Sequence, residues 1–265
     1  RQGLDMNLAR QAVANGAIVL SDTRLLKIAN QKLLFRHRGK VIEAESTVVI
    51  GADGSNSVVG KALSSWRPEF LLGIQYQVPL AKELERTIVF FHKSITHGYG
   101  WLFPKGITAN FGIGALPNQH ARPFELLELF LGMFRNLGLV TPGILSRSRG
   151  LIPVSGMRSE LVRGNVALVG DAAGLTHPIT GAGAPQAMMS GEMAGMAAVE
   201  AVRNGNIGYL SSYESEIRGL YSGVLDHAAS KRKLMIDRWS SHDMKSICSQ
   251  TWIAFEGYRK RVRNI

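Results

Sequence analysis

The residue with the clearest chemical potential is Asp171. It follows the apolar, β-branched segment Val166–Val169, which is typical of a buried strand. The pattern therefore places its carboxylate at the carboxyl end of a strand, where open α/β sheets bind their ligands. Gly170 permits a tight turn directly before the carboxylate. We expect a ligand-binding corner here.

Three glycines separate this corner from a helix. Gly174, Gly181 and Gly183 supply backbone that can lie flat against a ligand, and helical spacing of small residues begins at Ala184. The first amides of a helix lack intrahelical partners and point toward such a loop. A carboxylate beside them suits a ligand with hydroxyls at one point and an anion-forming end at another, as in a flavin ribityl chain and isoalloxazine ring. The alternative is a connection whose glycines only permit close packing.

A second corner follows the apolar segment Val48–Ile50 and contains Asp53 and Gly54. It does not fit a phosphate-binding P-loop, because Gly54 lies six residues before Gly60, where five are needed, and Ala62 stands where Ser or Thr would hold magnesium. We interpret it as a strand–turn–helix corner whose Asp53 and Gly54 face a polar segment of the ligand.

Elements around these corners indicate a mixed α/β fold. Residues 4–15 have amphipathic helical spacing, and Gly16 ends them. The next segments predict, in order, a strand at Ala17–Leu20, a hairpin over residues 24–38 that turns at Asn30-Gln31, and an extension at Val41–Ala44.

Residues 70–116 change character and predict an antiparallel sheet inserted into the α/β part. Its expected strands are Phe70–Val78, Thr87–His92, Gly98–Phe103 and Asn110–Ala115. An amphipathic helix at Pro123–Leu137 follows, and Gly150–Val154 leads back to the first part. The predicted domains are residues 1–63 with 153–205, the inserted residues 64–152, and a helical C-terminal region at 206–265.

Three aromatic residues alternate along one expected strand of the insert. Because side chains alternate in a strand, Tyr99, Trp101 and Phe103 share one face. That face is either part of a core or the wall of a long apolar pocket. Lys105, after Pro104, is either a solvated turn residue or an anchor for a phosphate head group.

Charge and cysteine content set the remaining expectations. The formal net charge is +11, and residues 217–265 hold ten Lys and Arg against four Asp and Glu, a net of +6. This basic region predicts peripheral association with an anionic membrane; the alternatives are a solvated helical face or a nucleic-acid contact, and a nucleic-acid partner is not expected. The single cysteine, Cys248, suits a cytoplasmic, reducing compartment. The seven histidines show no paired spacing, so no metal site is expected.

Two stretches, VVIGADGSNSVVGKAL and GNVALVGDAAGLTHPITGAGAPQAM, resemble the second and third FAD-binding fingerprints of the p-hydroxybenzoate-hydroxylase-like flavoproteins. A third, YGWLFPKGITANFGIG, is similar to the aromatic segment of the geranylgeranyl reductase family within them, as is the opening RQGLDMNLARQAVANGA. The resemblance covers about residues 1–205. It implies an α/β (α+β) fold with a partial three-layer FAD/NAD(P)-binding domain and an inserted antiparallel-sheet substrate domain. No Gly-x-Gly-x-x-Gly turn is present, so we expect the first βαβ unit to precede Arg1.

The resemblance also implies roles for individual residues. Asp171 would bond a ribityl hydroxyl, with Gly170 permitting the turn. The backbone of Gly181, Ala182 and Gly183 would lie along the pyrimidine edge of the isoalloxazine. The remaining cofactor-binding residues implied are Asp53 and Gly54, near the pyrophosphate and ribityl groups, and Pro178 in the glycine-rich loop. Tyr99, Trp101 and Phe103 would contact substrate.

The expected activity is saturation of C=C bonds in a polyprenyl lipid, with FAD as cofactor and NAD(P)H or reduced ferredoxin as electron donor. The resemblance assigns no catalytic residue. One alternative is a flavin monooxygenase or halogenase on the same scaffold. Another is a truncated remnant without catalysis.

Overall fold

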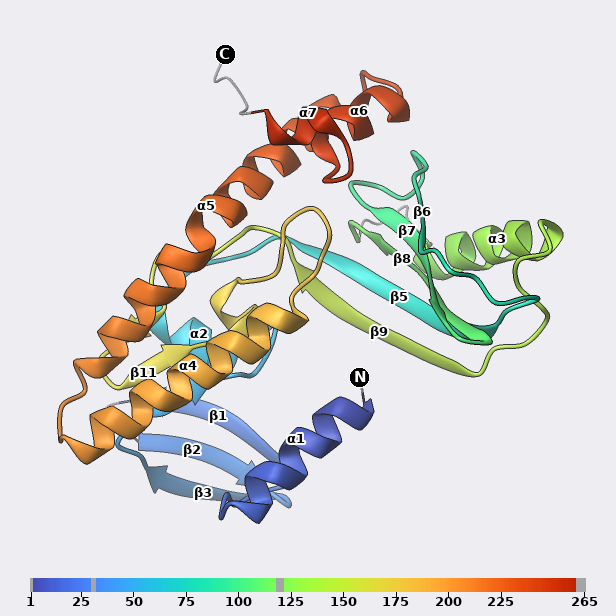
Figure 1. Ribbon diagram of the computed structural model, residues 1–265. Helices are drawn as coiled ribbons and strands as arrows, with labels where there is room; N and C mark the ends of the chain where they lie inside the picture. The colour runs from blue at the N-terminus through green and yellow to red at the C-terminus, as the bar shows by residue number, and fades with distance from the viewer. Residues whose placement is uncertain (1, 30–31, 118–121, 261–265) are drawn as a thin grey trace.

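One long helix, α5 (Tyr209–Arg238), joins two bodies of secondary structure in the computed structural model (Figure 1). The structure describes residues 2–29, 32–117 and 122–260. Their strands form two three-stranded sheets in one body and a five-stranded sheet in the other.

The chain begins with α1 (Gln2–Ala14), followed by a meander of β1 (Thr23–Ala29), β2 (Lys32–His37) and β3 (Lys40–Glu45). The first helix, the hairpin and its extension are therefore confirmed. The predicted turn at Asn30-Gln31 lies outside the described residues.

The predicted strand at Ala17–Leu20 is wrong. These residues have no strand structure, and Ile18 is 86% exposed. A strand needs a neighbour that satisfies its backbone groups, and no described strand lies against this segment. Its apolar pattern alone could not supply that neighbour.

The second sheet brings together the two segments that precede the predicted corners. Strand β4 (Val49–Gly51) runs parallel to β11 (Val166–Leu168), with Gly51 opposite Leu168, and β10 (Val162–Arg163) is antiparallel to β11. Both buried strands are confirmed. Because carboxyl ends of parallel strands meet at one edge, the two corners lie together.

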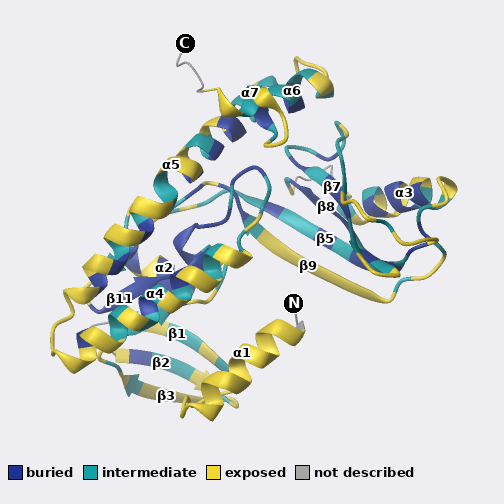
Figure 2. Ribbon diagram, viewed as in Figure 1, coloured by how far each residue is buried: buried dark blue, intermediate teal, exposed yellow. Residues whose placement is uncertain are grey.

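The inserted antiparallel sheet is also confirmed, with strand order β6-β7-β8-β5-β9. Its members are β5 (Phe70–Pro79), β6 (Ile88–Phe90), β7 (Tyr99–Lys105), β8 (Thr108–Ala115) and β9 (Ser146–Pro153). Helix α3 (Pro123–Asn136) covers one face of it and completes an apolar core. Strand β9 begins earlier than the predicted segment 150–154. Figure 2 shows why its pattern was weak, since most of β9 is exposed.

The remaining elements are helical, as predicted after Gly208. A 3₁₀ turn, η1 (Gly170–Ala173), precedes α4 (Ala184–Arg203), which packs with α5 around a second apolar core. Helices α6 (Met244–Thr251) and α7 (Glu256–Arg259) end the described chain. Among the described residues, no helix combines the length and apolarity that crossing a bilayer requires.

Helix α5 is fixed to the five-stranded sheet by a buried cation. Arg232 is 3% exposed; its guanidinium donates to Glu69 Oε2 at 3.0 and 3.1 Å and to the His97 carbonyl at 3.1 Å. Burying an unpaired guanidinium is strongly unfavourable, so Glu69 is required where Arg232 packs. This contact is one of the links between the two bodies.

Candidate functional site

The predicted corners meet at Asp171. Its carboxylate accepts hydrogen bonds from Thr176 Oγ1 at 2.6 Å and from Ser55 Oγ, 116 residues away, at 3.0 Å. Gly170 has a φ of +54°, which favours glycine at this turn. The half-buried carboxylate thus joins strand β11 to the corner after β4.

Asp53 has a local structural task. Its carboxylate accepts from the backbone amides of Val58 and Val59, at 2.6 and 3.1 Å, and from Ser57 Oγ at 2.5 Å. It therefore caps the start of α2 (Val58–Leu63) and satisfies amides that the helix leaves free. Gly54 has a φ of +75°, and no atom lies within 4 Å of the place a Cβ would occupy. On its open side this corner therefore presents the backbone of Gly54 and no side chain.

Residues 174–183, named the glycine loop here, fold back on themselves between η1 and α4. The His177 amide donates to the Ala182 carbonyl at 2.8 Å, and the Gly181 amide donates to the His177 carbonyl at 2.9 Å. Pro178 is buried, whereas Ala182 is exposed. The loop therefore presents the backbone around Ala182 to its surroundings.

Helix α4 begins at the end of the glycine loop without a side-chain cap. Gly183 is its N-cap residue, and proline follows in the first turn. A Cβ on Gly183 would lie 2.9 Å from Thr176 Oγ1 and 3.2 Å from Asp171 Oδ1. The absence of a side chain therefore lets the start of α4 pack directly against Thr176 and Asp171. An uncapped N-terminus favours a nearby anion by about 0.3–2 kcal/mol.

The three predicted aromatic residues share one face of β7. The Tyr99 and Trp101 rings are 5.6 Å apart and the Trp101 and Phe103 rings 5.9 Å apart. Trp101 is only 8% exposed, and its indole N–H donates to Gln75 Oε1 at 3.2 Å. It lies on Gly112, where a Cβ would come within 2.5 Å of the indole.

This aromatic wall reaches the glycine loop. The Tyr99 hydroxyl donates to the Thr180 carbonyl at 2.5 Å, although the two belong to different bodies. Burial raises the pKa of Tyr99 to about 12, so the hydroxyl stays protonated and remains a donor at neutral pH. The aromatic face and the Asp171 corner thus flank one loop.

Sequence reasoning missed two aromatic residues of the C-terminal region. The Trp252 ring lies 4.7 Å from Tyr99 and 4.9 Å from Phe91. The Tyr258 hydroxyl lies 3.1 Å from His177 Nε2 in the glycine loop. Both residues stand in a region whose positive charge dominates its composition. In the sequence, only the spacing of the aromatic residues in this region could have indicated these contacts.

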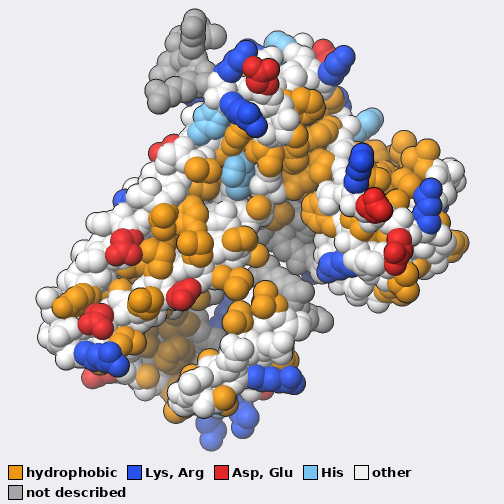
Figure 3. Space-filling model, in the orientation of Figure 1, with side chains coloured by type: hydrophobic (Ala, Val, Ile, Leu, Met, Phe, Trp, Pro, Cys, Tyr) orange, Lys and Arg blue, Asp and Glu red, His pale blue; other side chains and the backbone are white. Residues whose placement is uncertain are grey.

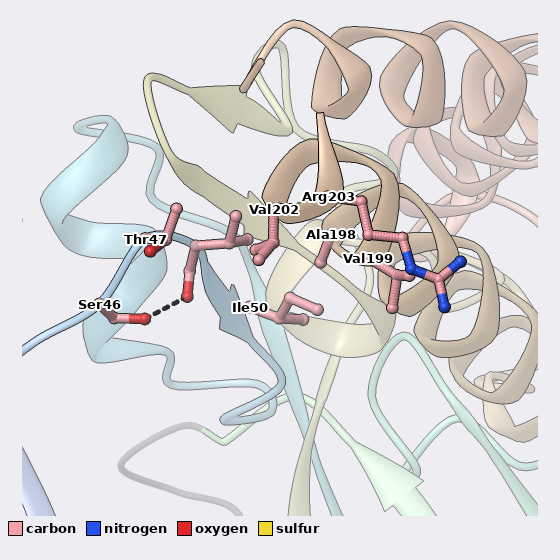
Figure 4. A pocket seen from close by; sticks show the side chains of 8 residues that line it. Ser46, Thr47, Ile50, Ala198, Val199, Val202 and Arg203 are labelled. Carbon is pink, nitrogen blue, oxygen red and sulfur yellow. Dashed lines mark hydrogen bonds between the residues drawn. The ribbon is translucent and has the colours of Figure 1, made fainter. Parts of the chain in front are cut away.

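One cavity lies away from the predicted site residues. It measures about 610 Å³ and lies between residues 46–50 and the end of α4, where Ala198, Val202 and Arg203 line it (Figure 4). A smaller one of about 160 Å³ adjoins the Asp53 corner beside Trp66 and Arg158. The large cavity is at the amino end of β4, opposite the end that carries the polar residues.

Comparisons with known proteins place these features in context. No family model matches the chain. It is 32% identical over 264 residues to digeranylgeranylglycerophospholipid reductase 2 of Methanococcoides burtonii, and 31% identical over 252 residues to the corresponding reductase of Methanocella arvoryzae. These alignments cover 93% and 85% of the chain and 64% and 61% of the relatives. The chain therefore spans somewhat less than two thirds of their length.

Solved structures support the fold. A geranylgeranyl bacteriochlorophyll reductase-like protein from Thermoplasma acidophilum superposes with a TM-score of 0.76 at 24% identity, over 95% of this chain and 72% of that one. A flavin-dependent halogenase gives 0.69 at 18% identity, over 100% and 50%. The predicted fold class is confirmed.

Proposed function

Because this chain is a homologue of the digeranylgeranylglycerophospholipid reductases, we propose that it carries the greater part of an FAD-dependent reductase that saturates C=C bonds of a polyprenyl lipid. The resemblance stated from the sequence is confirmed by these relatives. The observation that carries the proposal is the meeting of Asp171, the glycine loop and the uncapped start of α4 at one edge of the β4–β11 sheet.

The residues fit the flavin half of FAD. Asp171 retains lone pairs beyond those used by Ser55 and Thr176, and can accept from a ribityl hydroxyl. Glycine at position 183 brings the start of α4 directly against this carboxylate, since a Cβ there would lie 3.2 Å from Asp171 Oδ1. The backbone of residues 181–183 would lie along the electron-rich pyrimidine edge, with the first amides of α4 as donors, because the Gly181 and Ala182 amides already donate to His177 and Thr180.

The corner after β4 completes this arrangement in the proposal. Gly54 contributes open backbone toward the pyrophosphate and ribityl region. Asp53 would act there through the helix start that it caps, because its carboxylate already accepts three local hydrogen bonds. Pro178 would shape the loop from its buried position.

The bound flavin supplies hydride transfer, and the protein supplies orientation and exclusion of water. The helix start would favour the anionic reduced form by an amount within about 0.3–2 kcal/mol. Tyr99, Trp101 and Phe103 form the apolar surface next to the glycine loop. We assign this face to the prenyl chain, with the 8% exposed Trp101 mainly supporting its two neighbours. NAD(P)H or reduced ferredoxin would be the electron donor.

The test is anaerobic. The purified protein is loaded with FAD, reduced chemically and mixed with a digeranylgeranyl phospholipid, and the lipid is analysed by mass spectrometry. Gains of two hydrogens per double bond with reoxidation of the flavin are the expected result. Reoxidation that requires oxygen, with a hydroxylated or halogenated product, would transfer the assignment to the monooxygenase or halogenase reading.

Gly183→Ala tests the close packing of the α4 start against Asp171. The new Cβ would approach Thr176 Oγ1 to 2.9 Å, so the Thr176–Asp171 pair that we assign to the flavin site must shift. We expect an FAD dissociation constant raised roughly ten-fold, equivalent to about 1.4 kcal/mol. Gly191→Ala, where no atom lies within 4 Å of the added carbon, is the matched control. Equal affinities in a fluorescence titration would place the flavin elsewhere.

We also propose that the end of the molecule around α7 associates with anionic membranes. Four basic side chains of the C-terminal region are engaged within the protein, namely Arg218, Lys231, Arg232 and Arg238. The exposed ones are Lys233, Lys245, Arg259 and Lys260, while Arg261 and Arg263 lie outside the described residues. Figure 3 shows apolar side chains beside basic ones at this end, where Ile253 and Phe255 are 46% and 44% exposed.

Neutralising two of these charges should weaken vesicle binding. Each Lys or Arg near an anionic surface is worth about 1 kcal/mol, so Arg259→Gln with Lys260→Gln should lower partitioning about 30-fold at low salt. Lys40→Gln, on the distant strand β3, is the control. Sedimentation with phosphatidylserine vesicles measures the effect. Equal pelleting with neutral and anionic vesicles would refute electrostatic association.

A further inference from the structure

His177 organises the glycine loop through both of its ring nitrogens. Nδ1 accepts from the backbone amides of Ile179 and Thr180, at 3.3 and 3.2 Å, and Nε2 faces the Tyr258 hydroxyl at 3.1 Å. Two donors point at Nδ1, so this nitrogen carries no proton. The neutral ring is therefore protonated on Nε2, which donates to Tyr258.

The ring takes the place of a short polar side chain in a turn. Asn and Asp commonly accept from backbone amides two residues farther along the chain and stabilise such turns. Here the His177 ring accepts from the second and third following amides, while its own carbonyl accepts from the Gly181 amide at 2.9 Å. Together these bonds hold residues 177–182, whose backbone we assigned to the flavin.

Tyr258 is held in turn by α5. His227 Nε2 lies 2.6 Å from the Tyr258 carbonyl oxygen and therefore donates to it, and the two rings meet edge to face with centroids 4.8 Å apart. Lys231 Nζ, 2% exposed as a residue, donates to the Gly257 carbonyl at 2.7 Å and lies 5.9 Å from the Tyr258 ring. Helix α5 therefore holds in place the Tyr258 side chain that contacts the glycine loop.

We infer that His177, oriented by Tyr258, is a positioning residue that holds the glycine loop in its flavin-binding conformation and releases it when the ring takes a second proton. The inference rests on the proposed function for its consequence, but its structural content concerns the loop alone. A proton on Nδ1 would face the Ile179 and Thr180 amides, so neither bond could persist.

The direction with pH follows from the surroundings of the ring. Burial lowers the pKa of His177 from its ordinary value of 6.5; a backbone hydrogen bond of His177 partly offsets this, and the neighbouring His227 lowers the pKa further. The other titratable groups near the ring are Tyr258, Lys231 behind it, and Asp171, whose carboxylate is bonded to Thr176. Because the folded pKa is lowered, the loop is fully held above pH 6.5 and is released as pH falls through the lowered value.

Hydrogen exchange in the flavin-free protein tests the loop directly. Protection factors, corrected for the intrinsic rate at each pH, are measured for peptides that cover residues 177–183. We expect wild type to lose protection about ten-fold on acidification, since hydrogen bonds of ordinary strength are broken. In His177→Asn, whose side-chain oxygen can stand in for Nδ1 and does not titrate, protection should stay constant with pH.

Two further variants separate the contribution of Tyr258, which orients the ring, from that of His177 Nδ1, which accepts the amide hydrogen bonds. His177→Ala should show the roughly ten-fold loss at every pH, and Tyr258→Phe should show a smaller, about three-fold, loss. The FAD dissociation constant should rise about ten-fold in His177→Ala and stay within about two-fold of wild type in His177→Asn.

The exchange data decide the inference whether or not FAD binds. Loop protection that is independent of pH in wild type, or equal in the alanine and asparagine variants, would overturn it. If loop protection behaves as expected but no variant binds FAD, the role of His177 in holding the glycine loop is supported and the proposed function fails.

Discussion

Replacing Asp171 with alanine will weaken FAD binding by roughly 10- to 100-fold, because a hydrogen bond to a charged group contributes about 1.5–3 kcal/mol. The structure adds a second reason. The same carboxylate accepts from Ser55 and Thr176, so alanine also releases the corner after β4 from the start of the glycine loop. A flavin fluorescence titration of wild type and variant measures the change.

Two controls separate ligand binding from loop support. Thr176→Val removes one internal donor and leaves the carboxylate in place, so FAD affinity should fall only about three-fold. Asp171→Asn keeps an acceptor without the charge and should lie between alanine and wild type. An unchanged dissociation constant in Asp171→Ala would remove this residue from the cofactor site.

The Asp171 corner could be predicted because its signals are local. A β-branched run followed by Gly170-Asp171 indicates the end of a strand, and glycine at position 183 allows the close approach of the backbone to Asp171. Asp53 showed the limit of such reasoning. Its position after a strand suggested a ligand contact, whereas the carboxylate accepts from the amides at the start of α2. An aspartate that stabilises a helix start and one that contacts a ligand can have the same sequence pattern.

Features that depend on distant packing could not be predicted. Strand β9 is recognisable only through its register with β5, where Phe70 lies opposite Pro153, because most of its residues are polar and exposed. The failed strand at Ala17–Leu20 is the converse, an apolar segment with no described partner. Trp252 and Tyr258 reach the aromatic wall and the glycine loop only because α5 turns the chain back.

Burial gives the three aromatic side chains of β7 different tasks. Trp101 is 8% exposed and packed between Tyr99 and Phe103 above Gly112, so little of its surface is available to a substrate. We expect Trp101→Ala to lower the free energy of unfolding by about 3–5 kcal/mol, the usual loss for a buried indole. Thermal denaturation monitored by circular dichroism measures this loss. Trp101→Phe, which keeps most of the apolar volume, should lose much less.

Phe103→Ala should act on the substrate instead. Its ring is only partly buried, and a free face on the order of 80 Å² at about 25 cal/mol per Å² corresponds to roughly 2 kcal/mol. We therefore expect the affinity for a geranylgeranyl chain to fall about 30-fold, while FAD content and unfolding temperature change little. Ile107→Ala, an exposed apolar residue at the turn after β7, provides the control.

The measurement is the rate at which reduced flavin is reoxidised anaerobically over a range of prenyl lipid concentrations. A prenyl chain offers no polar groups to read, so a loss of apolar contact must appear as a higher half-saturating concentration. Small phenols serve as the comparison, since a hydroxylase for them would need buried donors. The donors of the wall are the Tyr99 hydroxyl and the Trp101 indole N–H, which are already bonded to Thr180 and Gln75. Unchanged prenyl turnover in Phe103→Ala, or rapid reoxidation by phenols with oxygen alone, would exclude this face as the substrate wall.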